Sequence, residues 1–229
     1  MEKVEKIADS AFLVGKYVYL RPPDIEKDVL KGTWAMWFND PKVTNYLIQG
    51  AYPNTVEQQV EYVKSVQKDP TRLVLSIINK EDDKHIGVIS FSNIDFFNRR
   101  SRIALVIGER KYHKAAPLEA MALLTKHGFE RLNLNKIDAS QCEGLWVWLN
   151  SLELIGYTLE GYFKAAQIRD GEVRDGVYTG VTAERYFQLK KERKGDICGA
   201  DILDLMANRR KENIALKLKD FIHNELYRE

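Results

Sequence analysis

The sequence predicts an α/β (α+β) domain, in which helices flank a mixed, mostly antiparallel sheet of about six or seven strands. Three β-rich runs follow one another over 72–78, 85–94 and 102–108, and short polar segments separate them. This succession predicts an antiparallel meander. Helical and β-rich segments then alternate as far as residue 189, which favours a sheet with helices packed against it.

Before the meander, the sequence predicts one strand and a pair of inward-facing tryptophans. Residues 16–21 are β-rich and end at Pro22 and Pro23, which stop a strand because proline has no N–H to donate. Trp34 and Trp37 are spaced one helical turn apart, so we expect both to pack inward.

The clearest helix covers residues 55–68. Thr55 and Gln58 have the spacing of a capping box, in which each side chain bonds the backbone N–H of the other residue. Four valines then recur at the spacing of one helical face: Val56, Val60, Val63 and Val66.

After the meander, Pro117 is expected to open a helix, because a missing N–H costs little at a helix start. A short strand over 136–140 and a helix over 143–155 follow, the helix ending at Gly156. The segment up to residue 189 is interpreted as two strands around Asp-Gly turns.

A charged stretch near residue 190 divides the chain into a domain over 1–189 and a C-terminal helical extension over 190–229. Two helical segments are expected there, over about 200–209 and 212–227. The second is amphipathic, so it is a candidate surface for a homo-oligomer or another partner.

Composition excludes several classes of function. The 35 basic and 33 acidic residues leave a net charge of +2, which gives no electrostatic case for nucleic acid or a membrane surface. The N-terminal residues lack the apolar run of a signal peptide, and no run is long enough to span a bilayer. Cys142 and Cys198 are far apart and are expected to be free thiols in the cytoplasm. No residues have the spacing of metal ligands.

The local sequences, in their order, resemble the GNAT superfamily of N-acetyltransferases, and especially its branch of ribosomal-protein alanine and amino-sugar acetyltransferases. The resemblance covers roughly residues 15–189. It is carried by seven segments: YLRPPDIEKD at 19–28, WFNDPKVTNYL at 37–47, YPNTVEQ at 52–58, IGVISFSNID at 86–95, IALVIGERKYHKAAPLEA at 103–120, HGFERLNLNKIDA at 127–139 and IGYTLEG at 155–161.

The resemblance implies the GNAT fold and acetyl-CoA as co-substrate. In that family, the loop and helix after the fourth strand cradle the pyrophosphate of CoA with backbone N–H groups. It also implies an amine acceptor, either a small molecule such as an amino sugar or sugar nucleotide, or a protein N-terminus. The residues it assigns to the cofactor are Val106, Ile107, Tyr112, His113, Lys114, Ala115 and Ala116.

The same loop departs from the family pattern of Q/R-x-x-G-x-G/A. Tyr112 replaces the usual Gln or Arg, Ala115 replaces the first glycine, and Pro117 replaces the last small residue. Proline removes one N–H donor to phosphate. Lys114 is either a compensating point charge or an ordinary surface lysine.

A second departure lies near Gly156. The family often has Asn, a small residue and a Tyr that protonates the departing thiolate, where this chain has Leu145, Trp148 and Leu152. Trp146 and Trp148 are large enough to fill the channel of the pantetheine arm, and the alternative for Trp146 is a core or surface position on an ordinary helix.

The candidate general base is Glu109, which follows the fourth strand of the family pattern. It is otherwise a solvated residue at a strand end. His113 is a second candidate base, although a surface or phosphate-contacting role suits its loop position. Asn39, Tyr46 and Tyr52 are candidates for the acceptor pocket by analogy with the family, with packing or surface roles as the alternative.

Two hypotheses of function follow. One is an N-acetyltransferase that acts on a primary amine. The other is a GNAT-like protein that has lost this catalysis and serves as a binding or assembly module, or carries different chemistry in the same cleft.

Overall fold

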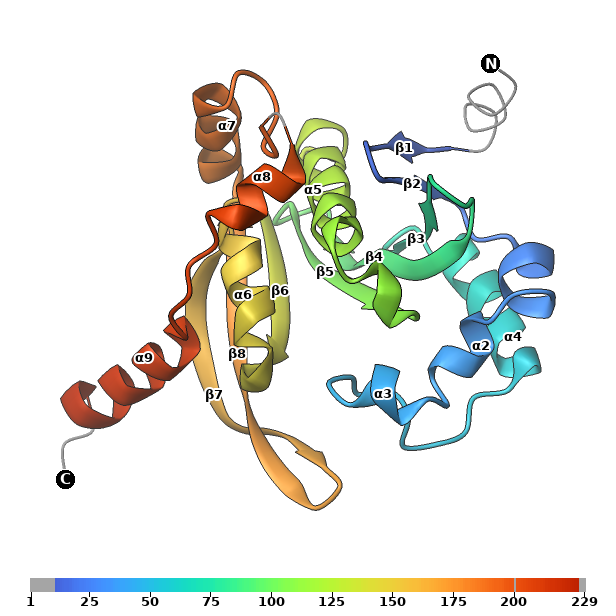
Figure 1. The fold of residues 1–229 in the computed structure, drawn as a ribbon, viewed down its shortest axis with the longest axis horizontal. Coiled ribbons are helices and arrows are strands. Elements are labelled where there is room, and N and C mark those ends of the chain that lie inside the picture. The colour runs from blue at the N-terminus through green and yellow to red at the C-terminus, as the bar shows by residue number, and fades with distance from the viewer. Residues whose placement is uncertain (1–10, 200, 227–229) are drawn as a thin grey trace. The chain divides into compact units, whose positions relative to one another are not determined.

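The chain forms eight strands among the described residues, five of them before Leu134 and three after it (Figure 1). A computed structural model describes residues 11–199 and 201–226 and divides the chain into two compact units, Met1–Leu134 and Asn135–Glu229. The strands are β1 Leu13–Val14, β2 Val18–Arg21, β3 Leu73–Asn79, β4 His85–Asp95, β5 Arg100–Ile107, β6 Lys136–Cys142, β7 Thr158–Arg169 and β8 Glu172–Thr182.

The first unit is an antiparallel meander with helices, as the sequence predicts. Each of β1 to β4 pairs with the next strand along the chain. Successive residues of β3 are buried, so both faces of this strand are covered. The helices of this unit are η1 Ile25–Leu30 (a π-helical turn), α2 Trp34–Trp37, α3 Pro41–Thr44, α4 Val56–Lys68, η2 Arg110–Tyr112 (a 3₁₀ turn) and α5 Ala115–Glu130.

The core of the N-terminal helices confirms the predicted inward packing. Trp34 and Trp37 of α2 are buried with Val63 of α4, and they pack against Val74 of β3 and Val88 of β4. The predicted capping box at the start of α4 is present, with the bonds between Thr55 and Gln58 formed in both directions.

Glu119 of α5 ties this helix to the turn between β1 and β2. Its buried carboxylate accepts the N–H groups of Lys16, Tyr17 and Val18 at 2.7 to 2.8 Å. A Cβ on Gly15 would lie 2.5 Å from the Glu119 carboxyl carbon, so only glycine fits there.

The second unit has an antiparallel sheet in the order β6-β8-β7. Its helices are η3 Glu143–Leu145 (a 3₁₀ turn), α6 Trp146–Glu153, α7 Ala183–Glu192, α8 Ile202–Ala207, α9 Ile214–Phe221 and η4 Ile222–Leu226 (a π-helical turn). A small core joins Leu149 of α6, Val177 of β8 and Ala215 of α9. The C-terminal helices therefore pack on the second unit itself.

The structure corrects two predictions of local structure. The helix expected to open at Pro117 begins two residues earlier, because the first turn of a helix tolerates a residue without an N–H. Only Asp170-Gly171 is a hairpin turn, with φ of 51° and 80°. The second Asp-Gly pair lies within β8, where the Asp175 carboxylate accepts the N–H of Ala165.

The strand count and the helix over 143–155 also differ from expectation. The two-residue β1 is too short to carry a pattern, and it adds an edge strand to those predicted. The helix expected over 143–155 begins as the 3₁₀ turn η3 and becomes α-helical only from Trp146 to Glu153.

Candidate functional site

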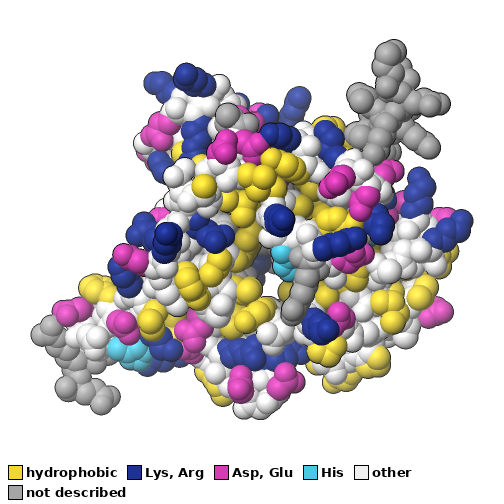
Figure 2. Space-filling view, viewed as in Figure 1, with side chains coloured by type: hydrophobic (Ala, Val, Ile, Leu, Met, Phe, Trp, Pro, Cys, Tyr) yellow, Lys and Arg dark blue, Asp and Glu magenta, His cyan; other side chains and the backbone are white. Residues whose placement is uncertain are grey.

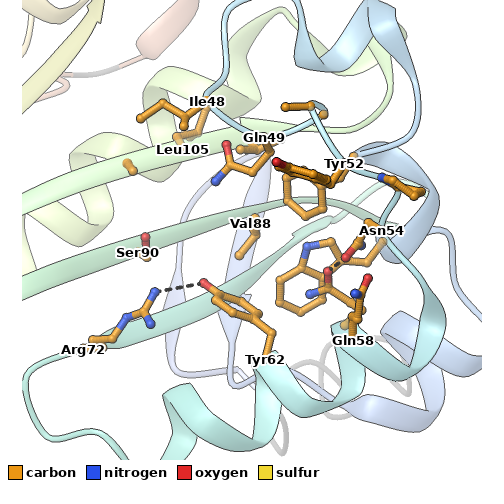
Figure 3. Close-up of a pocket in the computed structure, with 18 residues that line it drawn as sticks. Ile48, Gln49, Tyr52, Asn54, Gln58, Tyr62, Arg72, Val88, Ser90 and Leu105 are labelled. Carbon is orange, nitrogen blue, oxygen red and sulfur yellow. Dashed lines mark hydrogen bonds between the residues drawn. The ribbon is translucent and has the colours of Figure 1, made fainter.

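A pocket of about 450 Å³ lies entirely within the first unit, between the N-terminal helices and the strands β4 and β5 (Figure 3). The segments that line it are far apart in sequence. The lining residues are Trp34, Phe38, Ile48, Gln49, Gly50, Ala51, Tyr52, Pro53, Asn54, Gln58, Gln59, Tyr62, Arg72, Val88, Ser90, Ala104, Leu105 and Val106.

Hydrogen bonds to Asn54 fix the loop that forms one wall of the pocket. The Asn39 amide donates to the Asn54 carbonyl and accepts the Asn54 N–H, both at 2.7 Å. The Asn54 side chain in turn donates to the Ala35 carbonyl at 3.0 Å and to the Gln59 side-chain oxygen at 3.1 Å. These bonds hold the loop against α2 and α4.

Arg72 is the only residue with a formal charge among those that line the pocket. Its guanidinium donates to the Tyr62 hydroxyl at 3.3 Å and lies 5.4 Å from the centre of the Tyr62 ring. Figure 3 shows the two side chains pointing toward each other beside Ser90. Burial raises the pKa of the Tyr62 phenol, so this partner stays neutral at physiological pH.

Two buried donors in the pocket lack acceptors within the part of the chain that the structure describes. They are the indole N–H of Trp34, a residue with no exposed surface, and the side-chain amide nitrogen of Gln59, a residue 3% exposed. Buried donors are almost always paired in proteins. Two unpaired donors on residues of one pocket lining are therefore a feature that folding alone leaves unsatisfied.

A second buried polar cluster lies next to Trp34, and its groups are paired. Asp28 accepts from both terminal nitrogens of Arg21, at 2.8 and 2.5 Å, and from the Ser76 hydroxyl at 2.7 Å. The His85 ring lies 5.6 Å from the Trp34 ring and 3.5 Å from the Asp28 carboxylate. Burial lowers the pKa of His85 to about 4, against the opposing effect of Asp28. His85 is therefore neutral at pH 7 and has a structural role beside Asp28.

The loop predicted to bind the cofactor runs from the end of β5 to the start of α5. The Tyr112 hydroxyl donates to Asp82 at 2.5 Å, so this side chain ties the loop to the turn between β3 and β4. The Glu109 carboxylate lies 3.5 Å from the Lys111 ammonium and does not line the pocket.

At the start of α5, no side chain caps the helix and no acidic residue lies in the first turn. The N–H groups of Ala115 and Ala116 belong to this first turn, so they have no acceptor within the helix. Lys114 is exposed immediately before them. Pro117 occupies the third helical position and contributes no donor.

The structure brings some of the predicted site residues together and separates others. Tyr52 and Val106 line the pocket, and Ile107 is buried next to Val106 at the end of β5. Asn39 does not line the pocket, but its side chain bonds the backbone of Asn54 in the pocket loop. Tyr46 is not among the lining residues. His113 is an exposed residue between η2 and α5.

Of the described lining residues, sequence reasoning assigned only Tyr52 and Val106 to the site. The missed residues that matter most for its chemistry are Trp34, Gln59, Tyr62 and Arg72. Trp34 was expected to pack in the core, and it does so while also lining the pocket. Tyr62 lies four residues before Val66 on the helix that the valine pattern defined, and Arg72 precedes a strand. A polar or aromatic residue on the buried side of a helix was the available signal, because such positions are usually apolar.

In the second unit, the residues that replace the family pattern belong largely to packing. Leu152 is fully buried and Leu149 beside it is 1% exposed, while Leu145, Trp146 and Trp148 are partly exposed. Cys142 is a buried free thiol and Cys198 is a partly exposed one. No group of three His, Cys, Asp or Glu side chains could hold a metal ion among the described residues.

The surface charge and the helix hydropathy of the described residues complete the description of the molecule. Neither sign of charge dominates the face in Figure 2, where Lys and Arg side chains are interspersed with Asp and Glu. No helix in the described part of the chain is long and apolar enough to cross a membrane.

Comparison with known proteins identifies relatives of the chain. It is 32% identical over 123 residues to a Bacillus licheniformis protein named uncharacterized N-acetyltransferase p20. The aligned stretch covers 52% of this chain and 67% of that protein. Among solved structures, spermidine N-acetyltransferase from Vibrio cholerae, in complex with CoA and spermine, superposes with a TM-score of 0.68 at 16% identity, covering 76% of this chain and 99% of that one.

A GCN5-related N-acetyltransferase from Brucella melitensis superposes with a TM-score of 0.66 at 18% identity, covering 85% of this chain and 93% of that one. At these identities the two structures support the fold alone. Residues 18–141 match the family described as acetyltransferase (GNAT) domain, a stretch of more than half of the 229 residues. Fold and family match agree, and the chain belongs to the GNAT acetyltransferase family.

Proposed function

We propose that this protein transfers an acetyl group from acetyl-CoA to a primary amine, held in the pocket of the first unit. The observation that carries the proposal is a pocket of about 450 Å³ whose β5 wall leads into the uncapped start of α5. One strand thus connects a cavity of small-molecule size to the type of helix start that binds phosphates.

The start of α5 fits the diphosphate of CoA with a reduced set of donors. Ala115 and Ala116 offer two N–H groups, and the absence of acidic residues in the first turn leaves the positive end of the helix dipole unopposed. Lys114 would add a point charge to the phosphates. Small side chains at these two positions let a phosphate approach the backbone, which partly compensates for the missing glycines.

Acetyl-CoA would supply an activated thioester carbonyl, and the chain would supply the orientation of the amine. None of the described lining residues carries a carboxylate that could accept the amine proton. We therefore expect proton transfer to water, with Glu109 or His113 as a more distant base. Buried Leu152, at the place of the family's tyrosine, supports direct release of CoA thiolate or its protonation by solvent.

The acceptor that we propose is a small molecule, such as an amino sugar or sugar nucleotide, or else a protein N-terminus. The pocket favours the small molecule, since aromatic and amide side chains from three separate segments line it. Spermidine, the substrate named for one structural relative, is a further small amine to test.

A GNAT-fold binding module without catalysis is the second candidate, and the replaced residues Pro117 and Leu152 favour it. The C-terminal helices bear on this candidate. Ala215 of α9 is buried against Leu149 and Val177, and the Asn150 amide donates to the carbonyls of Arg210 and Glu212 at 2.9 and 2.7 Å. Because α9 already covers this core, a partner or a second copy would use its outer face, where Leu216 and Phe221 are exposed.

Calorimetric titration with acetyl-CoA tests the proposal. We expect saturable binding, and at 100 times the dissociation constant the ligand should add roughly 2.7 kcal/mol to the free energy of unfolding. Lys114→Ala should raise the dissociation constant about fivefold, through loss of about 1 kcal/mol of phosphate attraction. Lys126→Ala is the matched control, an exposed lysine on the same helix but three turns away. Absence of any heat or melting shift at millimolar acetyl-CoA would contradict the proposal and favour the binding module.

A further inference from the structure

The pocket of the first unit presents positive charge and hydrogen-bond donors, and it presents no negative charge. Arg72 is its only charged lining residue, and the unpaired donors of Trp34 and Gln59 lie in the same lining. We propose that the amine acceptor also carries an oxyanion, a carboxylate or a phosphate, that binds Arg72 while Trp34 and Gln59 donate to its oxygens. The inference rests on the proposed acetyl transfer for the role of the pocket.

No carboxylate among the described residues forms a direct ion pair with Arg72, and Asp69 acts on it only through longer-range attraction. The Arg72 side chain contacts Tyr62, a neutral phenol, through one hydrogen bond and the face of the ring. The nearby Asp69 carboxylate instead accepts the N–H and the hydroxyl of Thr71, at 2.9 and 2.7 Å. A guanidinium held by a neutral neighbour keeps donors for a planar oxyanion, which it binds in a two-point arrangement.

Tyr62 places the three donor side chains in one neighbourhood. Its ring lies edge-on to Trp34 with 6.2 Å between centroids, and its hydroxyl accepts from Arg72. Gln59 lies on the same helix α4, one turn before Val63, and its side-chain oxygen is occupied by Asn54. That bond leaves the Gln59 NH₂ group as the part available to a ligand.

Burial makes it energetically costly to leave these two donors without acceptors. Trp34 has no exposed surface and Gln59 is 3% exposed, so bulk water does not reach these donors in the ligand-free protein. A ligand with several oxygen acceptors pairs them, whereas an alkyl amine leaves them unpaired. Oxygen-rich anions such as sugar phosphates, or amines with a carboxylate, match the pattern.

The same pattern disfavours a polycation. A second ammonium group on the acceptor would face Arg72 with no carboxylate among the lining residues to attract it. The Vibrio cholerae protein with a similar fold is named as a spermidine N-acetyltransferase. The pocket lining of this chain, with Arg72 as its charged residue, instead suits an acceptor that carries negative charge. Fold alone does not set the acceptor.

The test compares matched amines that differ only in the anion. The pairs are glucosamine 6-phosphate against glucosamine, and 4-aminobutanoate against 4-aminobutanamide, with spermidine as the polycation. For the wild-type protein with saturating acetyl-CoA, we expect kcat/KM at least about tenfold higher for the anionic member of one pair. The phosphate pair and the carboxylate pair identify which oxyanion the site prefers.

Variants assign the preference to Arg72. Arg72→Gln should reduce the ratio within the preferred pair to about one, and Arg72→Lys should retain part of it, because lysine keeps the charge without the fork of donors. Arg131→Gln, an exposed arginine at the end of α5, should leave the ratio unchanged. Melting temperatures of all variants establish that they fold.

A binding measurement separates this inference from the proposed activity. Calorimetric titration of the CoA-saturated protein with the same five amines reports affinity even where no acetyl is transferred. Tighter binding of an anionic amine, lost in Arg72→Gln, supports the inference whether or not the protein is catalytic. Equal or tighter binding of glucosamine, 4-aminobutanamide or spermidine, a preference that survives Arg72→Gln, or no binding of any probe overturns it.

Discussion

Two buried polar regions of the first unit differ in whether the protein itself satisfies their hydrogen-bonding groups. Asp28 is fully buried, and its carboxylate accepts from Arg21, Ser76 and the backbone N–H of Asp24. In the pocket, Trp34 and Gln59 are equally buried but hold donors without acceptors in the described chain. The first region is complete as folded, whereas the second keeps donors that our inference assigns to a ligand.

Two tryptophans of the same helix make the contrast at the level of single atoms. The indole N–H of Trp37 donates to the Thr33 hydroxyl at 3.0 Å. Three residues earlier on α2, the indole N–H of Trp34 has no such partner within the described residues. Both rings are core by their burial, and what distinguishes Trp34 is its unpaired nitrogen and its place in the pocket lining.

The largest effect is expected from breaking the satisfied region. Asp28→Ala leaves the Arg21 guanidinium, 11% exposed, without its carboxylate. Removal of one partner of a buried ion pair typically costs about 3–5 kcal/mol. Chemical denaturation measures this loss. Glu26→Gln on the same helical turn removes only an exposed pair with Lys31 and should change stability by less than about 0.5 kcal/mol. Similar losses for the two variants would contradict the distinction.

The same region should make stability depend on pH. His85 has a folded-state pKa of about 4, while its unfolded-state value is near 6.5. Between these values the unfolded chain binds the proton and the folded chain does not, so stability falls as pH falls from about 6.5 to 4. The loss is on the order of 3 kcal/mol at the lower end. Burial and the Arg21 bond act in opposite directions on Asp28, and its net lowered pKa adds a loss at more acidic pH.

Denaturation curves at several pH values measure this dependence, and His85→Gln should flatten it between pH 6.5 and 4. The absolute stability of this variant is not the test, because the ring also packs on Trp37 at 4.9 Å. A wild-type slope retained in His85→Gln would assign the pH dependence to other groups.

The smallest effect on stability is expected in the unsatisfied region. Gln59→Leu removes an unpaired buried NH₂ group along with one bond from Asn54, which keeps its bond to Ala35. These changes offset each other, so the ligand-free protein should change in stability by less than about 1 kcal/mol. Binding of the amine acceptor should nevertheless weaken. A loss of several kcal/mol in the ligand-free protein would place Gln59 with the satisfied region.

The sequence predicted the strands and helices of the first unit better than it predicted the pocket of that unit. The capping box of α4 and the meander of β3 to β5 were predictable because local hydrogen bonds and two-residue periodicity determine them. The start of α5 was displaced by two residues, since proline is tolerated throughout the first helical turn.

The pocket required the structure. The pocket combines Trp34 of α2, Gln59 of α4 and Arg72, which directly precedes β3. No local sequence pattern brings these three residues together. Tyr52 and Val106 were assigned through the family resemblance rather than from periodicity. Whether a buried donor has an acceptor depends on three-dimensional packing, so the sequence of one segment does not predict it.

The indole N–H of Trp34 offers the most direct test of the claim that the pocket is completed by an oxygen-rich ligand. Its resonance in the ¹⁵N–¹H spectrum can be assigned with Trp34→Phe among the four tryptophans of the chain. On titration of the CoA-saturated protein with the preferred anionic amine, this resonance should shift downfield as a hydrogen bond forms, while that of Trp37 stays nearly fixed. Saturable binding that leaves the Trp34 resonance in place would contradict the account.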